Sequence, residues 1–147
     1  LGKLYAIQTT ASTTEGAQYV YCKKLVKNET GERPLYTGYH STVSAFYYGT
    51  LIVGDQFDGN FDGYSALDTN IPLSSLKEPT AFDSPTTFAV ASVIPGWTAA
   101  LQLMRAGERW MLYIPWQSAY GSSGNNDGTI PGYTALTFDL LLERIVE

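Results

Sequence analysis

The residues best suited to chemistry lie in two segments, Val93–Trp97 and Ala119–Gly121. The first joins a short apolar run to Pro95, which is expected to begin a helix because its missing N–H costs nothing at that position. Trp97 then lies just inside the helix. The second segment places Tyr120 at the start of a glycine-rich loop. Together they predict a shallow apolar pocket with the ring of Trp97 as its floor.

Other kinds of site find less support in the sequence. The single histidine, His40, has no marked Ser or Cys partner of the kind that a nucleophilic triad requires. The glycine-rich loop 121–132 lacks the lysine of a phosphate-binding loop. Asp58–Gly63 matches the first half of a calcium-binding EF-hand loop, but Thr69 stands where the bidentate glutamate belongs. An Asx-rich turn is therefore the favoured interpretation of that segment.

The composition describes one globular, acidic domain. The chain has 147 residues, of which 44% are hydrophobic and 16% charged, and this length can bury a core without disulfides or metal. The net charge is −5, and no basic run is present, which argues against nucleic acid or an anionic membrane surface as a partner. No apolar run approaches the roughly 20 residues that span a bilayer. The single cysteine, Cys22, cannot form an intrachain disulfide and is expected to lie buried in a strand.

The elements that must position the pocket are several strands and one helix. Trp97, Leu101 and Met104 follow a helical spacing and predict one apolar face, with Gly107 at the C-terminal cap. Alternation and β-branched or aromatic residues predict strands near 17–27, 42–52, 87–91, 108–114 and 136–143. This combination predicts an α+β fold in which a half-open antiparallel sheet wraps around a central helix.

The chain is predicted to contain one domain and one arm. Residues 1–15 are small and polar and are expected to form a flexible N-terminal arm, while residues 16–147 form the domain. Within the domain, residues from about 59 to 86 are polar and rich in turn signals, which predicts a long insertion. In the last two strands, alternation places Arg109 and Asp139 on the face opposite the main apolar residues.

Taken together, these segments resemble the FKBP-type peptidyl-prolyl cis-trans isomerases, and most closely the bacterial branch that includes the macrophage infectivity potentiator proteins. The resemblance runs from about Gln18 to Ile145 and implies the FKBP-like fold, an antiparallel half-barrel around one short helix. It rests on several segments in the family's order, namely Tyr47–Asp58, Phe88–Trp97, Ala99–Met104 with Gly107-Glu108, Ile114-Pro115, Ala119–Gly121, Ile130-Pro131 and Leu136–Phe138.

The resemblance also implies an activity and a site. It implies catalysis of rotation about X–Pro bonds, in assistance of protein folding, without a cofactor or metal. Tyr47, Asp58 and Tyr120 are the implied catalytic residues, and Tyr120 would donate its hydroxyl to a substrate carbonyl. The role of Asp58 stays open between orienting Tyr47 and interacting with the twisted carbonyl carbon. The residues implied to bind the proline ring are Phe57, Phe88, Val93, Ile94, Trp97 and Phe138.

Departures from the family pattern leave other functions open. Asn125–Thr129 replaces a shorter and more apolar stretch, Gly132 stands where a second proline is common, and the segment 59–86 is longer than in compact relatives. These differences lie beside the expected pocket. A catalytically weak peptide- or partner-binding module and a small-ligand-binding β-barrel therefore remain alternatives, and the affinity for macrolide inhibitors stays open.

The resemblance finally implies partners and a location. Proline-containing polypeptides are the expected substrates, and nucleic acid is not an expected partner. The bacterial relatives are largely exported, which implies the periplasm or the outer membrane, and leaves the cytoplasm open. Contact with a membrane would come only through an N-terminal anchor outside this sequence. The chain begins at Leu1 without an initiator methionine, which fits a trimmed mature form.

Overall fold

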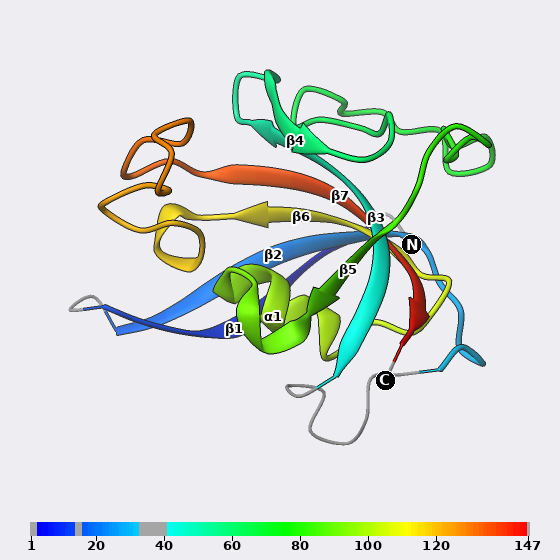
Figure 1. Cartoon of the computed structure of the whole chain (residues 1–147), viewed down its shortest axis with the longest axis horizontal. Helices are drawn as coiled ribbons and strands as arrows, with labels where there is room; N and C mark the ends of the chain where they lie inside the picture. Colours follow the sequence, from blue (N-terminus) through cyan, green and yellow to red (C-terminus); the bar gives the residue numbers. More distant parts are fainter. Residues whose placement is uncertain (1–2, 14–15, 33–40, 147) are drawn as a thin grey trace.

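The computed structural model describes residues 3–13, 16–32 and 41–146. His40, considered above as a catalytic residue, lies outside these ranges. The longest helix in the described ranges has seven residues, too few to cross a bilayer. In chain order the elements (Figure 1) are β1 (Leu4–Thr13), β2 (Gly16–Val26), β3 (Thr42–Leu51), β4 (Gln56–Gly59), β5 (Thr86–Ala89), the 3-10 helix η1 (Val90–Ser92), α1 (Pro95–Leu101), β6 (Arg109–Ile114), the 3-10 helix η2 (Trp116–Ser118) and β7 (Leu136–Ile145).

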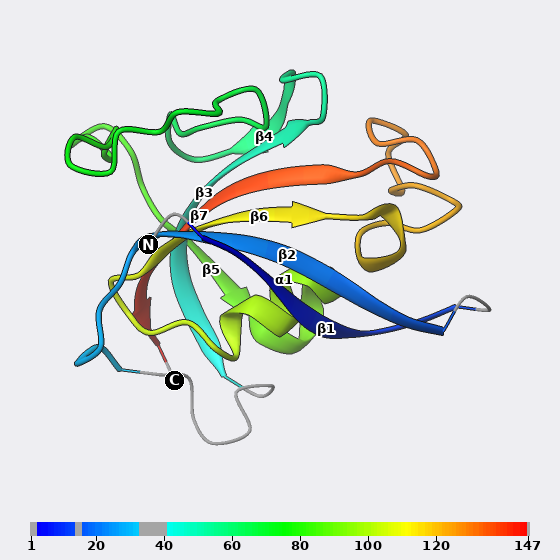
Figure 2. The same ribbon diagram turned by 180° about the vertical axis from the view of Figure 1, so that it is seen from behind.

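All of these strands belong to one antiparallel sheet. Its strand order is β1-β2-β6-β7-β3-β4, and β5 shares with β4 the edge of β3 that faces away from β7. The sheet is strongly curved and α1 lies against its concave side (Figures 1 and 2). The order ends at β1 and β4, so the sheet stays open. The predicted α+β fold is confirmed, and the sheet is not the closed barrel that the alternative of a small-ligand-binding β-barrel suggests.

The concave face of the sheet and α1 share one apolar core. Trp97, Leu101 and Met104, the predicted helix stripe, are buried, and they pack with strand residues such as Leu112 and Leu140, which are fully buried. Alternate residues of a strand point to the same face, so each strand supplies the core with every second side chain. The helix therefore sits where it fixes Trp97 against the sheet.

α1 ends earlier than the sequence predicts. Its last residue is Leu101, and Gly107 does not cap it, although Gly107 has the positive φ of 90° that suits glycine. The N–H of Gly107 donates to the carbonyl of Leu142 at 2.7 Å, and the N–H of Ala106 donates to the carbonyl of Glu32 at 2.7 Å. A longer helix would bond these two N–H groups to its own carbonyls. Here they donate to neighbouring segments instead, so the helix ends early.

The expected flexible arm over residues 1–15 is wrong for residues 4–13. They form β1, which pairs with β2 from Leu4 opposite Lys23 to Thr13 opposite Gly16. Thr9 is buried, and its Oγ1 lies 3.0 Å from Oγ of Ser118. Threonine and isoleucine favour extended backbone, and pairing with β2 satisfies the backbone groups. A polar sequence can therefore form an edge strand.

The convex face of the sheet carries a second buried layer. Leu25 and Met111 of the sheet pack with Tyr64, which lies in the segment 60–85 between β4 and β5. We call residues 60–85 the covering segment, because they lie over this face. Ile71 and Leu76, also from the covering segment, pack against the same cluster. The covering segment therefore shields part of the face opposite the main core from water.

Arg109 and Asp139 form a buried ion pair under the covering segment. The exposed fractions of the two side chains are 1% and 0%, and two hydrogen bonds join them, from Nε to Oδ1 at 2.8 Å and from Nη2 to Oδ2 at 2.7 Å. The covering segment adds the N–H of Tyr64, which donates to Oδ2 at 3.0 Å, and the carbonyl of Lys77, which accepts from Nη1. The pair thus ties the sheet to the covering segment.

Two matching turns shape the covering segment, which has no helix or strand in the described structure. They are Ser65–Asp68 and Thr80–Asp83, and each has the same hydrogen bonds. In each turn the first N–H and the first hydroxyl donate to the final aspartate, the final N–H donates to the first carbonyl, and the third N–H donates to the first hydroxyl. Such local bonds fix a turn without help from a sheet.

Cys22 is fully buried in β2, as predicted, and burial raises the pKa of its thiol from 9.0 to about 11. The native protein therefore keeps the thiol proton at pH values where the unfolded chain loses it. Because unfolding then releases a proton, we expect the free energy of unfolding to fall as the pH rises from about 9 to about 11. C22A should lack this part of the decrease, as measured by denaturant unfolding across that range. The same slope in both proteins would contradict the prediction.

Candidate active site

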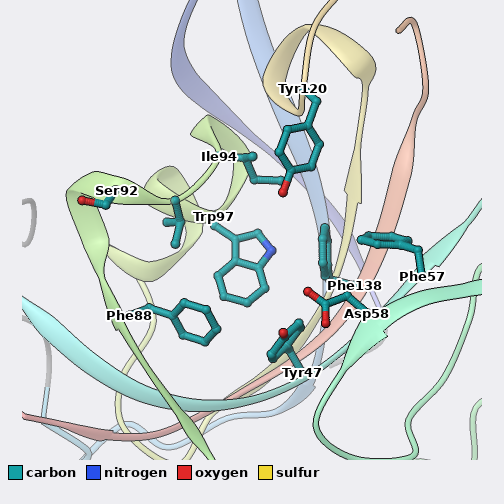
Figure 3. A pocket seen from close by; sticks show the side chains of 10 residues that line it. Tyr47, Phe57, Asp58, Phe88, Ser92, Ile94, Trp97, Tyr120 and Phe138 are labelled. Atoms are coloured by element: carbon teal, nitrogen blue, oxygen red, sulfur yellow. The ribbon is translucent and has the colours of Figure 1, made fainter. Parts of the chain in front are cut away.

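A cavity of about 300 Å³ opens beside the start of α1 (Figure 3). All nine residues that the sequence analysis selected line it, so the structure brings them together. Sequence reasoning passed over one lining residue, Ser92, at the end of η1, whose hydroxyl points away from the centre of the pocket. The complete lining is Tyr47 of β3, Phe57 and Asp58 of β4, Phe88 of β5, Ser92, Val93, Ile94, Trp97 of α1, Tyr120 and Phe138 of β7.

Trp97 is the centre of an aromatic cluster. Its ring centroid lies 4.9 Å from that of Phe88, 5.2 Å from that of Phe138 and 5.4 Å from that of Tyr47, and each pair meets edge to face. Phe57 extends the wall by an edge-to-face contact with Phe138 at 5.5 Å. This is the favoured geometry for aromatic rings. It holds the indole of Trp97 as the floor of the pocket.

Gly49 makes room for the wall of the pocket. It lies on β3 opposite Phe138 of β7 and Asp58 of β4. A Cβ atom at this position would lie 2.7 Å from the ring of Phe138 and 2.8 Å from the ring of Phe57. Only glycine allows both rings to pack over the strand at this point.

The start of α1 is held by hydrogen bonds that fix the rim. Ile94 is the N-cap residue and Pro95 follows it at the first helical position. The N–H groups of Trp97 and Thr98 donate to the carbonyl of Ile94 at 2.9 and 3.1 Å. The hydroxyl of Thr98 donates to the carbonyl of Val90 at 2.7 Å. The segment that carries Val90 and Ile94 is therefore tied to the helix.

Two tyrosine hydroxyls and one carboxylate supply the polar groups of the pocket. Burial, followed by the nearby carboxylate of Asp58, raises the pKa of Tyr47. Burial raises the pKa of Tyr120 as well, and Asp58 and Asp127 add to this effect. Both hydroxyls therefore keep their protons at neutral pH and can act as donors. Figure 3 shows the hydroxyl of Tyr47 near Asp58 and that of Tyr120 above Trp97.

The rim loop after Tyr120, in which the sequence departs from the family pattern, forms a closed turn. Oδ1 of Asp127 accepts hydrogen bonds from the N–H and the hydroxyl of Thr129 at 3.1 and 2.7 Å. The side chain of Asn125 accepts from the N–H of Ile130 at 2.8 Å and donates to the hydroxyl of Thr129 at 2.8 Å. The two hydrogen bonds from Thr129 lower the pKa of Asp127. The rim is therefore fixed and carries an ionised carboxylate.

The arrangement can bind a small apolar ring and hold polar atoms beside it. Aromatic side chains form most of the lining, and among the described residues no lysine or arginine belongs to it. The hydroxyl of Tyr120 stands above the indole of Trp97 (Figure 3), where it can donate to a carbonyl group beside a bound ring. The mouth is open to solvent on one side, since Tyr120 is 38% exposed, so an extended polymer can cross it.

Comparisons with known proteins agree with this architecture. The family FKBP-type peptidyl-prolyl cis-trans isomerase matches residues 37–143. The macrophage infectivity potentiator of Trypanosoma cruzi is 52% identical over 76 residues, which are 48% of this chain and 38% of that protein. The outer membrane protein MIP of Legionella longbeachae is 40% identical over 106 residues, which are 72% of this chain and 34% of that protein.

The same similarity extends to the structure. A crystal structure of a peptidyl-prolyl cis-trans isomerase from Pseudomonas syringae matches with a TM-score of 0.65 and 27% identity, covering 95% of this chain and 81% of that one. The fold is therefore FKBP-like. The chain spans between 34% and 52% of the lengths of five curated relatives that it matches.

Proposed function

Because the chain belongs to the FKBP-type peptidyl-prolyl cis-trans isomerase family, in the branch of the macrophage infectivity potentiator proteins, we propose that it catalyses rotation about X–Pro bonds. One observation carries the proposal. Residues from four strands, from the start of α1 and from the loop after β6 converge on one apolar cavity of about 300 Å³ with an indole floor. A cavity of this size and lining suits the ring of a proline residue.

The reaction needs neither a nucleophile nor a bond cleavage. Rotation about a peptide bond has a barrier of about 18–20 kcal/mol because it breaks the amide resonance. In the twisted transition state the resonance is lost, so the carbonyl dipole is smaller than in the planar amide. An apolar pocket therefore disfavours the planar ground state more than the transition state, and this difference lowers the barrier.

The lining residues divide into a floor, walls and polar groups. Trp97 would lie under the proline ring, and the hydroxyl of Tyr120 would donate to a substrate carbonyl and so hold the chain while the bond turns. Asp58 would act through Tyr47, whose hydroxyl lies beside its carboxylate, or directly on the twisted carbonyl. The walls would be formed by Tyr47, Phe57, Phe88 and Phe138, with Val93 and Ile94 at the rim.

The runner-up is a peptide-binding module with weak catalysis. The closed rim turn around Asn125–Thr129 favours it, because the carboxylate of Asp127 in this turn raises the pKa of Tyr120. The proposed partners are proline-containing polypeptides in either case, and macrolide inhibitors are a further candidate class of ligand. We place the activity in the cell envelope, with one relative named as an outer membrane protein.

The test is catalysed cis-to-trans isomerisation of a short peptide with an apolar residue before proline. The wild-type protein should exceed the uncatalysed rate. D58A should lower kcat/KM about tenfold or more, since it removes the only carboxylate that the described residues contribute to the lining. D62A is the matched control. The side chain of Asp62, four positions after Asp58, is 80% exposed, and among the described residues it pairs only with Lys77. A folded wild type without activity would exclude the enzyme and favour the binding module.

A further inference from the structure

The edge of β3 changes partner in the middle of the candidate site. From Tyr48 to Thr50 it pairs with β4, and from Thr42 to Ala45 it pairs with β5. Tyr47 lies between the two stretches, and neither β4 nor β5 supplies a paired residue opposite it. Yet a strand's N–H and C=O groups need partners wherever water is excluded. The junction therefore requires a substitute for the missing strand.

The side chain of Asn60 supplies this substitute. Its Oδ1 accepts from the N–H of Tyr47 at 2.8 Å, and its Nδ2 donates to the carbonyl of Ala45 at 3.1 Å. The backbone N–H of Asn60 donates to the carbonyl of Tyr47 at 2.9 Å. The amide group thus takes the place of a peptide group next to β3. The partners fix its orientation, since an N–H can only donate and a carbonyl can only accept.

The same amide reaches the second partner strand. Nδ2 of Asn60 also donates to Oγ1 of Thr86 at 3.0 Å, and Thr86 is the first residue of β5. Both hydrogens of the amide and its oxygen are therefore used. One side chain joins the end of β4, the edge of β3 and the start of β5.

Each of the three joined segments carries a lining residue of the pocket. Asp58 precedes Asn60 by two positions, Phe88 follows Thr86 by two positions, and Tyr47 is the residue whose N–H is bound. Tyr47 and Phe88 are also in contact, with ring centroids 5.4 Å apart. A shift of one segment against another would change the distances among these groups directly.

We propose that Asn60 is a positioning residue of the pocket, which acts by holding Tyr47, Asp58 and Phe88 in register; this inference rests on the proposed function. Asn60 touches no reacting atom and does not line the cavity. Asp58–Gly63 thus forms a turn whose amide serves the edge of the sheet. A side chain with one acceptor and two donors is required, and aspartate would keep only the acceptor for Tyr47.

The experiment compares N60A and N60D with a matched control, N28A. Asn28 is also half-buried, and its Nδ2 also donates to a backbone carbonyl, that of Ala106 at 2.8 Å, but it lies outside the pocket lining. All variants are assayed with the X–Pro peptide well below their Tm values. N60A should lower kcat/KM about tenfold, mostly through kcat, and speed hydrogen exchange at the amide of Tyr47. N60D, which keeps the acceptor for Tyr47, should fall between N60A and the wild type, and N28A should stay within about twofold of the wild type.

The outcomes separate the two proposals. If the wild type is active and the kcat/KM of N60A stays within about twofold of the wild-type value, the positioning role is overturned and the proposed function stays intact. An equal loss in N60A and N28A would also overturn it, since general destabilisation would then explain both. A wild-type protein without activity would remove the proposed function, and the inference with it.

Discussion

Replacing Arg109 with methionine is expected to lower the free energy of unfolding by about 3–5 kcal/mol, because it leaves the buried carboxylate of Asp139 without its charge partner. The pair is almost completely buried, and Arg109 also lies over the rings of Phe61 and Tyr64, at 5.2 and 5.5 Å from their centroids. R109M therefore removes the ion pair and a contact with the covering segment at once. Denaturant unfolding, monitored by circular dichroism, measures this loss of free energy.

Two further variants test whether that loss comes from the unpaired buried charge. R109M/D139L removes both charges and should recover a large part of it, since no uncompensated charge stays buried. K27M breaks the exposed pair of Lys27 and Glu29, whose atoms lie 3.6 Å apart, and should cost less than about 1 kcal/mol. If R109M cost no more than K27M, the covering segment would not depend on the buried pair.

Trp97 gives the second large effect, on catalysis. W97L should lower kcat/KM by about 30- to 100-fold in the isomerase assay, because it removes the aromatic floor on which the proline ring would rest. It should also lower the free energy of unfolding by about 3 kcal/mol, since Trp97 is 3% exposed and contacts three other rings. Activity must therefore be measured under conditions in which the variant is folded.

W110L is the matched control for this prediction. Trp110 is also a buried tryptophan, 2% exposed, and belongs to the same core, but it does not line the pocket. The two variants should lose similar stability, while only W97L loses most of its activity. If both variants lost activity equally, the role of Trp97 as the pocket floor would be contradicted.

The sequence allowed the fold class to be predicted from local patterns, and the resemblance to the FKBP family supplied the members of the candidate site. Alternation marked the strands, and Pro95 with the spacing of Trp97 marked the helix. The aromatic residues of the site lie in segments such as Phe88–Trp97 whose order along the chain is itself informative. Their convergence on one cavity then follows from the topology of the sheet.

What the sequence could not reveal depends on contacts between distant segments. β1 has a loop-like composition and becomes a strand because β2 offers it a pairing edge. Arg109 and Asp139 are charges in alternating strands, a pattern that normally predicts an exposed face, and only the covering segment makes that face a buried one. The sequence around Asn60 predicts only a turn. Its hydrogen bonds to Tyr47 and Thr86 depend on the point where β3 changes partner from β4 to β5.

The strand order has a consequence for the kinetics of folding. The two inner strands that bind the sheet together, β6 and β7, come last in the chain, and they pair with β2 and β3 near its beginning, as Tyr21 with Tyr113 and Thr50 with Thr137. During synthesis β2 and β3 therefore each keep one unpaired edge until β6 and β7 have left the ribosome. Sheets dominated by such distant pairings fold in about milliseconds to seconds. A protein proposed to speed a slow step in other chains is thus itself a slow folder, for a reason of topology.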